Sequence, residues 1–260
     1  MTTQTRSEVA PPNAGAVAGK LNPLAGGASM PVDAPYYQSP PFHYRDAQAM
    51  AIAYETDSEA AAAMLPEGLE LPSPAVATLS FLRYPFSTFG PYDEVILGII
   101  CRWQDEPCSY IAHIVVNTVP PLVAGREIWG YPKKLARIEI AQDEEMMTGV
   151  MERPDGIRIA SAAMRIESPL EVGPPGRGAG LSLRVIPSVE EGKPPSLAEL
   201  IATRNTTTVH EAWSGTGTVA FEGRSALDPW HLLPAKRVLS TTFRRFDMVL
   251  PHGEVIRTYG

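Results

Sequence analysis

The chain is poor in cysteine, has no zinc-binding pattern and contains no long apolar run. Its 260 residues include only Cys101 and Cys108, which are too few for a disulfide framework. No Cys/His cluster has zinc-ligand spacing, and no glycine-rich run resembles a phosphate-binding loop, so neither a metal nor another cofactor is expected. No apolar stretch approaches the roughly 20 residues of a membrane-spanning helix. The first fifteen residues are polar and lack the apolar core of a signal peptide, so a soluble, cytoplasmic protein is expected.

Positive charge is also scarce. The formal net charge is -7 and the pI is about 5.3, which argues against nucleic acid or an anionic membrane as the main partner. The hydrophobic fraction of 44% is ordinary for a globular protein and suffices for a sizeable core. A small-molecule function is therefore favoured over a nucleic-acid or membrane function.

The apolar pattern divides the chain into a short tail and one domain. Residues 1–33 are rich in Ala, Gly and Pro without apolar periodicity, which predicts a flexible N-terminal tail. Residues 34–260 are predicted to form a single domain, because neither half alone has a closed core. A capping box at 56–59 predicts a short helix over 60–65, which Pro66 ends, and a second short helix is expected over 196–203.

Most of the domain carries the pattern of short strands bounded by turn residues. The expected strands cover 47–54, 75–84, 94–103, 109–117, 135–140, 146–152, 157–166, 181–187, 206–213, 217–221, 237–243 and 248–250. Many short strands with few helices favour a mainly β fold, in which an antiparallel sheet closes on itself or folds as a sandwich.

Lysine is rare in this chain, and its few copies are unevenly distributed. Only five lysines stand against seventeen arginines, and Lys133 and Lys134 are adjacent in the run Gly-Arg-Glu-Ile-Trp-Gly-Tyr-Pro-Lys-Lys-Leu at 125–135. Two lysines in a loop are usually solvated charges. A lysine becomes a nucleophile when burial or a nearby positive charge removes its proton, and apolar neighbours together with an adjacent lysine can supply both.

The whole run resembles the signature of the acetoacetate decarboxylase family, and similarity extends from about Pro35 to Tyr259. The resemblance implies that Lys133 forms a Schiff base and that Lys134 lowers the pKa of that nucleophile; acetoacetate decarboxylase is itself the standard example of such activation. It also implies a closed, cone-like antiparallel β-barrel with flanking strands and a few short helices, assembled into a large homo-oligomer. No cofactor takes part in the family reaction.

The energy required defines what such a site must achieve. An ordinary lysine titrates near 10.4, so well under ~0.1% is free amine at neutral pH. Titration at about 6–7 requires roughly 5 kcal/mol against the charged form. A second charge about 6 Å away, at an effective dielectric of about 20, supplies on the order of 3 kcal/mol. Lys134 is thus expected to contribute about half, and desolvation the rest.

Two further residues are candidates through the resemblance. Glu94 precedes Lys133 by 39 residues, the same uninterrupted spacing as between the family's glutamate and lysine, and is expected to relay protons. Arg45 lies in Phe-His-Tyr-Arg-Asp, which resembles the family segment with a pocket arginine, and is expected to anchor a substrate carboxylate. Without the resemblance, Glu94 is an ordinary turn residue and Arg45 a surface arginine.

One position departs from the family pattern. Ungapped register places Leu79 where the family has a second pocket glutamate, which predicts a more apolar pocket and leaves the reaction open.

The leading hypothesis is a Schiff-base lyase that decarboxylates a small β-keto acid such as acetoacetate. The alternatives are an aldolase-dehydratase that joins pyruvate to an aldehyde through the same lysine, and a non-catalytic β-barrel that binds a small molecule.

Overall fold

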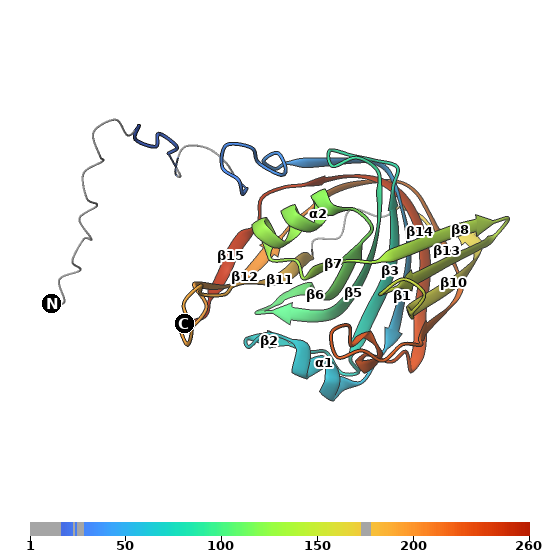
Figure 1. The fold of residues 1–260 in the computed structure, drawn as a ribbon. Coiled ribbons are helices and arrows are strands. Elements are labelled where there is room, and N and C mark those ends of the chain that lie inside the picture. Colours follow the sequence, from blue (N-terminus) through green and yellow to red (C-terminus); the bar gives the residue numbers. More distant parts are fainter. Residues whose placement is uncertain (1–16, 23, 25–28, 173–177) are drawn as a thin grey trace.

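A computed structural model describes residues 17–22, 24, 29–172 and 178–260. Fifteen strands form one strongly curled sheet (Figure 1). In chain order they are β1 (Phe42–Glu55), β2 (Leu69–Glu70), β3 (Val76–Tyr84), β4 (Phe86–Ser87), β5 (Tyr92–Trp103), β6 (Glu106–Val116), β7 (Lys133–Leu135), β8 (Arg137–Asp143), β9 (Met146–Glu152), β10 (Arg158–Pro169), β11 (Ala179–Ile186), β12 (Leu197–Thr203), β13 (Thr206–Phe221), β14 (Arg237–Leu250) and β15 (Glu254–Thr258). The expectation of a mainly β fold is confirmed.

The sheet is curled but not closed by backbone pairing, which corrects the expected closed barrel. Its main path runs β15-β12-β11-β6-β5-β3-β1-β14-β13-β10-β9-β8, and within the described residues no ladder joins the two ends. Side chains instead connect β8 and β9, at one end of this path, to the central strand β3. Arg83 on β3 donates to the carbonyl oxygen of Ile140 on β8 at 2.5 Å. Phe81 lies so close to Gly149 on β9 that a Cβ there would stand 2.5 Å from its ring.

Helices are few and short. They are α1 (Ser58–Met64), α2 (Val119–Ala124), the π-helical turn η1 (Gly125–Trp129) and the 3-10 turn η2 (Trp230–Leu232). Asp57 caps α1 by accepting from the backbone N–H groups of Glu59 and Ala60, so the capping residue is one position later than the capping box at 56–59 predicts. In Figure 1, α2 lies beside β7 over one face of the sheet.

Two cores lie on opposite faces of the central strands. The first core contains Ile52, Leu79, Leu97, Met151 and Trp230, among others. The second core contains Tyr44, Tyr84, Tyr92, Ile114 and Trp129, among others. Successive side chains of a strand point to opposite faces, so β3 and β5 contribute to both cores in alternation. The inner strands are therefore apolar on both faces.

Three expectations about elements are wrong for tertiary reasons. The segment expected as a helix at 196–203 is strand β12, because it pairs with both β11 and β15 and buries Leu200 and Ile201. The two short strands expected within 206–221 are the single strand β13, and those within 237–250 are the single strand β14. The helical stretch α2–η1 before the lysine pair has no counterpart in the sequence expectation.

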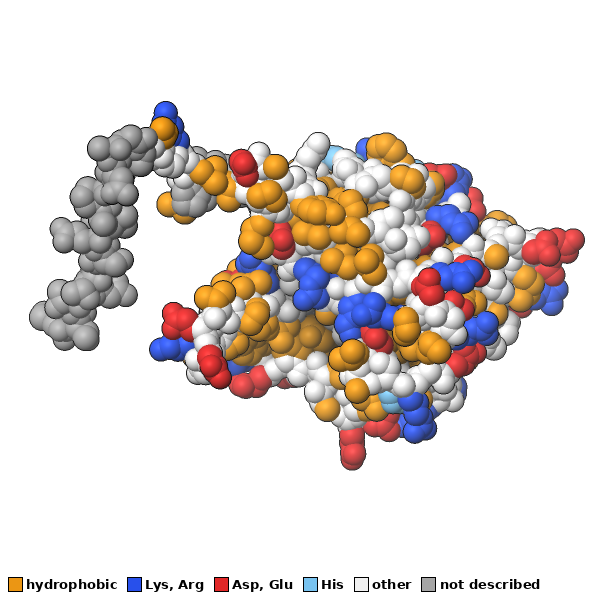
Figure 2. Space-filling view, in the orientation of Figure 1, with side chains coloured by type: hydrophobic (Ala, Val, Ile, Leu, Met, Phe, Trp, Pro, Cys, Tyr) orange, Lys and Arg blue, Asp and Glu red, His pale blue; other side chains and the backbone are white. Residues whose placement is uncertain are grey.

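The described surface mixes both signs of charge. Figure 2 shows acidic and basic side chains interspersed over the visible face rather than gathered by sign, in keeping with the nineteen ion pairs among the described residues. Within the described ranges no helix has the length and apolarity needed to cross a membrane. Residues 1–16 of the expected tail lie outside the described residues, while Ser29, inside that expected tail, is buried.

Candidate active site

The turn before β7 brings Lys133 to the second core. Gly130 ends η1 in the left-handed conformation, with φ of 71°, and a Cβ there would come within 2.3 Å of the backbone of Arg184. The backbone N–H of Tyr131 donates to the carbonyl oxygen of Gly125 at 3.0 Å and reverses the chain. β7 then pairs in parallel with β6, with Lys133 beside Ile114 of the second core. The signature therefore forms a helix-to-strand turn that directs the side chain of Lys133 into the second core.

The first glycine of the signature makes room for that lysine. A Cβ on Gly125 would lie 2.7 Å from Cδ and 2.9 Å from Cε of Lys133. Gly125 has ordinary helical dihedrals, φ -59° and ψ -44°, so its backbone conformation does not require glycine. The requirement for glycine comes from the lysine side chain that passes over it.

Lys133 and Glu94 form a buried pair. The Nζ atom of Lys133 donates to Oε2 of Glu94 at 2.7 Å, and each side chain is only 6% exposed. Glu94 reaches the pair from β5, whose partner β6 carries Val116 opposite it and also pairs with β7. The expected proximity of these two residues, 39 positions apart, is thus present in the fold.

Tyrosines surround the pair. Tyr84 donates to Oε1 of Glu94 at 3.2 Å, and the rings of Tyr92 and Tyr131 are centred 5.8 Å from the Lys133 amine. The hydroxyl of Tyr92 in turn donates to that of Tyr44 at 3.3 Å. Burial, reinforced by the charge of Glu94, raises the pKa of both Tyr84 and Tyr92 well above the usual value. These phenols therefore stay neutral and act as hydrogen-bond donors.

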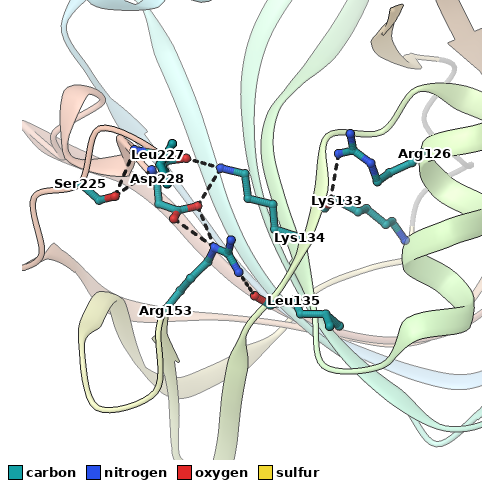
Figure 3. Close-up of polar contacts among 8 residues, drawn as sticks. All are labelled: Arg126, Lys133, Lys134, Leu135, Arg153, Ser225, Leu227 and Asp228. Atoms are coloured by element: carbon teal, nitrogen blue, oxygen red, sulfur yellow. Dashed lines mark hydrogen bonds and ion pairs between the residues drawn. The ribbon is translucent and has the colours of Figure 1, made fainter. Parts of the chain in front are cut away.

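Lys134 lies on the other face of β7. Its Nζ atom donates to Oδ1 of Asp228 at 2.9 Å and to the carbonyl oxygen of Leu227, and its side chain is 35% exposed. Figure 3 shows the side chains of Lys133 and Lys134 leaving the strand in opposite directions. Adjacent residues of a strand point to opposite faces, so the structure does not bring the charge of Lys134 next to the amine of Lys133. The expected role of Lys134 as a neighbouring charge lacks the required geometry.

Arg45 is not brought to the site either. It follows a buried tyrosine on β1, is 52% exposed, and forms an ion pair with Asp247 at 3.5 Å. A register shift between Tyr44 and Ala47, where Asp46 has a φ of 55°, turns this part of β1 outward. The position of Arg45 is that of a surface arginine and not that of an anchor for a substrate carboxylate in the pocket.

Leu79 also lies away from the lysine. It pairs with Ile52 and Leu97 and is fully buried in the first core, whereas Glu94 pairs with Leu82 and faces the second. The expectation that Leu79 lines the pocket is therefore wrong, because ungapped register fixes the position along a strand but not the face that holds the site. Leu79 does not alter the chemistry around Lys133.

Sequence reasoning missed the tyrosines and the ion cluster on the far face. Tyr92 had a usable signal, because it lies two residues before Glu94 on the same strand and so shares its face. Tyr84 lies opposite Tyr92 in the antiparallel ladder, which only the register reveals. Asp228 lies in the segment between β13 and η2, and no local pattern links it to Lys134.

The chemistry available at this site is that of an amine and a carboxyl group in an apolar surrounding. In the described part of the chain, no group of three His, Cys, Asp or Glu residues is placed to hold a metal ion. A buried amine that passes its proton to the adjacent carboxylate becomes a nucleophile toward a carbonyl carbon. The neutral phenols can donate hydrogen bonds but cannot accept that proton.

Comparison with known proteins agrees with this chemistry. The family model for acetoacetate decarboxylase matches residues 29–259. The acetoacetate decarboxylase of Acidiphilium cryptum is 32% identical over 237 residues, which cover 89% of this chain and 95% of the relative. That of Chromobacterium violaceum is 31% identical over 242 residues, which cover 89% and 94%.

Solved structures give the same fold. The acetoacetate decarboxylase from Legionella pneumophila has a TM-score of 0.81 at 30% identity, covering 92% of this chain and 99% of its own. The enduracididine biosynthesis enzyme MppR, complexed with pyruvate, has a TM-score of 0.75 at 18% identity, covering 90% and 99%, a likeness of the fold alone. With the family model matched over nearly the whole chain, the protein belongs to the acetoacetate decarboxylase family.

Proposed function

We propose that Lys133 is the Schiff-base nucleophile of this enzyme, a carboxy-lyase that decarboxylates a small β-keto acid. The observation that carries the proposal is the buried contact of 2.7 Å between Nζ of Lys133 and Oε2 of Glu94. Its relatives bear the name acetoacetate decarboxylase, so acetoacetate is the first substrate to test.

The surroundings of the pair favour a free amine. Each partner is 6% exposed, so both charges have lost most of their hydration, at a cost of several kcal/mol per ion. Transfer of the proton from Lys133 to Glu94 removes both charges at once and leaves the amine ready to attack. This route needs no second positive charge, which fits the position of Lys134 on the other face.

The reaction then proceeds in steps that balance. The amine attacks the ketone carbon, and the carbinolamine loses water with a proton from Glu94 to give an iminium. The carbon–carboxylate bond breaks, carbon dioxide leaves, and the bonding electrons move to the iminium nitrogen to form an enamine. Protonation of the enamine carbon and hydrolysis release the ketone and restore Lys133. Glu94 supplies and recovers the protons, while Tyr84 holds its other oxygen in place.

One cavity shares a residue with the surroundings of Lys133. A cavity of about 340 Å³ is lined by Tyr131, Arg126 and Pro132 from the signature and by residues of β11. The cavity shares Tyr131 with the surroundings of the Lys133 amine, which lies 5.8 Å from the centre of that ring, but neither Lys133 nor Glu94 lines it. Its volume lies at the lower end of the range for ligand pockets, roughly 300–1,000 Å³.

A second candidate uses the same amine. Condensation of pyruvate with an aldehyde also starts from a lysine iminium. MppR, which has the same fold and whose structure contains pyruvate, makes this reaction the second candidate. Leu79 no longer favours it, since that residue lies in the first core. Release of carbon dioxide from acetoacetate, measured against enone absorbance from pyruvate plus an aldehyde, separates the two reactions.

Trapping of the iminium tests the proposal directly. The enzyme is incubated with acetoacetate and borohydride, and the reduced adduct is located by peptide mass analysis. The expected adduct is on Lys133, with none on the exposed Lys236, which forms a surface ion pair with Asp57. An enzyme that releases carbon dioxide but leaves Lys133 unmodified contradicts the mechanism. Absence of both product and adduct with acetoacetate and with pyruvate would favour the non-catalytic small-molecule binder over both reactions.

The setting of the enzyme remains a prediction. We propose a large homo-oligomer, as the family resemblance implies, located in the cytoplasm. Light scattering coupled to size-exclusion chromatography measures the subunit number, and a single-chain mass at micromolar concentration contradicts assembly.

A further inference from the structure

The two cysteines of the chain face each other across a hairpin. Cys101 on β5 and Cys108 on β6 are directly opposite in the antiparallel ladder, which has no register shift from Gly98 to Trp103 (Figure 1). Both are free thiols. Directly opposite residues have Cβ atoms about 4.5–5.5 Å apart, and a disulfide needs about 3.5–4.5 Å. A movement of about 1 Å therefore suffices to bring the two sulfur atoms to bonding distance.

The cysteines lie in a third, smaller core that the chemistry of Lys133 does not use. Cys101 is 1% exposed and Cys108 is 5% exposed. The core around them also contains Tyr110, Leu181 and Leu200, among others. Successive side chains of β5 alternate between its faces, so Cys101 points to the face opposite that of Glu94. A bond between the two sulfur atoms therefore leaves the Glu94 face of β5 unobstructed.

The two thiols differ in access and in proton affinity. Burial, followed by the charge of Cys108, raises the pKa of Cys101 to about 12, so this sulfur stays protonated at neutral pH. Cys108 is less buried and follows two exposed residues, Glu106 and Pro107, and its thiol donates to the carbonyl oxygen of Glu106 at 3.5 Å. A small oxidant therefore reaches Cys108 first, and Cys101 is placed to react second.

We propose that Cys101 and Cys108 form a reversible redox site, which hydrogen peroxide closes to a disulfide across the β5–β6 hairpin. The Cys108 thiolate attacks one peroxide oxygen and the O–O bond breaks. Cys108 becomes a sulfenic acid, and the departing hydroxide takes up the proton that Cys108 released. The sulfur of Cys101 then attacks that of Cys108, the S–O bond breaks, and the second hydroxide leaves as water with the Cys101 proton. Two thiols and one peroxide thus give one disulfide and two waters, and a dithiol reductant reverses the change by exchange.

The disulfide would join two strands that support the reactive site. β5 carries Glu94, and β6 pairs with both β5 and β7. The bridge closes only the short loop 101–108, so its stabilisation is at the low end of the usual range, and a rise in Tm of about 5 °C is expected. Since the modification uses neither the amine of Lys133 nor a substrate, it goes beyond the proposed decarboxylation.

The test treats the folded full chain with hydrogen peroxide in the absence of substrate. Thiols are counted after denaturation in guanidinium, and the two thiols of the untreated chain should fall to none. Trypsin cleaves after Arg102, between the two cysteines, so peptides 84–102 and 103–126 should appear as one linked species that dithiothreitol separates. The Tm of the oxidised chain should exceed that of the reduced chain by about 5 °C.

Two variants assign the sulfur atoms. In Cys101→Ala, oxidation should stop at a sulfenic acid on Cys108 that dimedone traps, and in Cys108→Ala no dimedone adduct should form on Cys101. Neither variant should show the rise in Tm. If a variant does not fold, the wild-type peptides alone decide the matter.

Three results overturn the proposal. They are thiols that resist peroxide in the folded chain and react only in urea, a disulfide between two chains, and a sulfinic acid without the linked peptides. Release of carbon dioxide is not measured in this experiment, so its failure is distinct from a failure of the proposed function.

Discussion

The two faces of β7 give adjacent lysines different chemistry. On one face, Lys133 meets a single carboxylate and a set of neutral phenols in the second core, with 6% of its side chain exposed. On the other face, Lys134 is 35% exposed and shares a buried carboxylate with Arg153. Both amines contact an acid at 2.7–2.9 Å, so the ion pair itself does not distinguish them.

What distinguishes them is the number of charges around each carboxylate and access to water. Glu94 accepts from one cation and one phenol, so a proton transfer leaves a neutral, satisfied pair. Asp228 accepts from two cations, and neutralising one of them still leaves the other to hold its charge. The Lys133 face is therefore suited to proton transfer and the Lys134 face to permanent ion pairing. The comparison predicts effects of different size on the two faces.

Glu94→Gln is expected to have the largest effect. An amide at this position still accepts a hydrogen bond but cannot take the proton of Lys133 or return it to the carbinolamine. A positioned acid–base group typically contributes about 100- to 10,000-fold, so kcat for carbon dioxide release should fall by that range. Glu139→Gln, at an exposed position on β8 with a side chain 59% accessible, is the matched control and should leave kcat unchanged. Wild-type turnover in Glu94→Gln would remove the proton relay from the mechanism.

Gly125→Ala is expected to have a smaller effect that is confined to the Lys133 face. The added methyl group lies 2.7 Å from Cδ of Lys133, so the side chain must move away from Glu94. A displacement of about 1 Å predicts roughly a 100-fold loss of kcat. The melting temperature should hold, because alanine suits the helical dihedrals of this position. Gly180→Ala is the control, since its nearest neighbour would be 3.8 Å away. Equal activity in the two variants contradicts the crowding argument.

The sequence predicts the strands of the fold better than it predicts the residues of the site. Strands such as 146–152 were predicted with their correct bounds, because alternating apolar residues and flanking turns are local signals. Glu94 and Lys133 were paired correctly because a family spacing of 39 residues stands for a contact through two ladders. The segment 197–203 was misjudged since its pairing partners decide its state, and they lie far away in the chain.

The errors at the site share one cause. Lys134, Arg45 and Leu79 were each assigned by their position along the chain, and each lies on a face that turns away from Lys133. A face depends on register and on bulges such as the shift between Tyr44 and Ala47, which no local pattern reveals. Linear spacing therefore located the strands that build the site, and alternation of faces decided which of their residues take part.

His113 gives the smallest and most specific test, because it reports on the Lys134 face alone. Its ring stacks on Trp230 at a centroid distance of 5.6 Å, and its Nε2 atom has no hydrogen-bond partner in the part of the chain that the structure describes. Burial, followed by the charge of Lys134, lowers the pKa of His113 from 6.5 to about 4, while Asp228 acts in the opposite direction.

Because the folded-state pKa of His113 is depressed, the unfolded chain binds its proton more readily between these two values. The stability that this group contributes is complete above about pH 6.5 and is lost as the pH falls toward 4. Acidification from about pH 7.5 to 5 should lower the free energy of unfolding by about 2 kcal/mol through this group. His113→Phe should flatten that part of the profile in urea denaturation, whereas His252→Phe at an exposed position should not. At pH 7.5 the adduct on Lys133 should be unaffected by His113→Phe, because the titrating ring and the reactive amine are on opposite faces of the sheet. An unchanged acid loss of stability in His113→Phe would place the responsible group elsewhere.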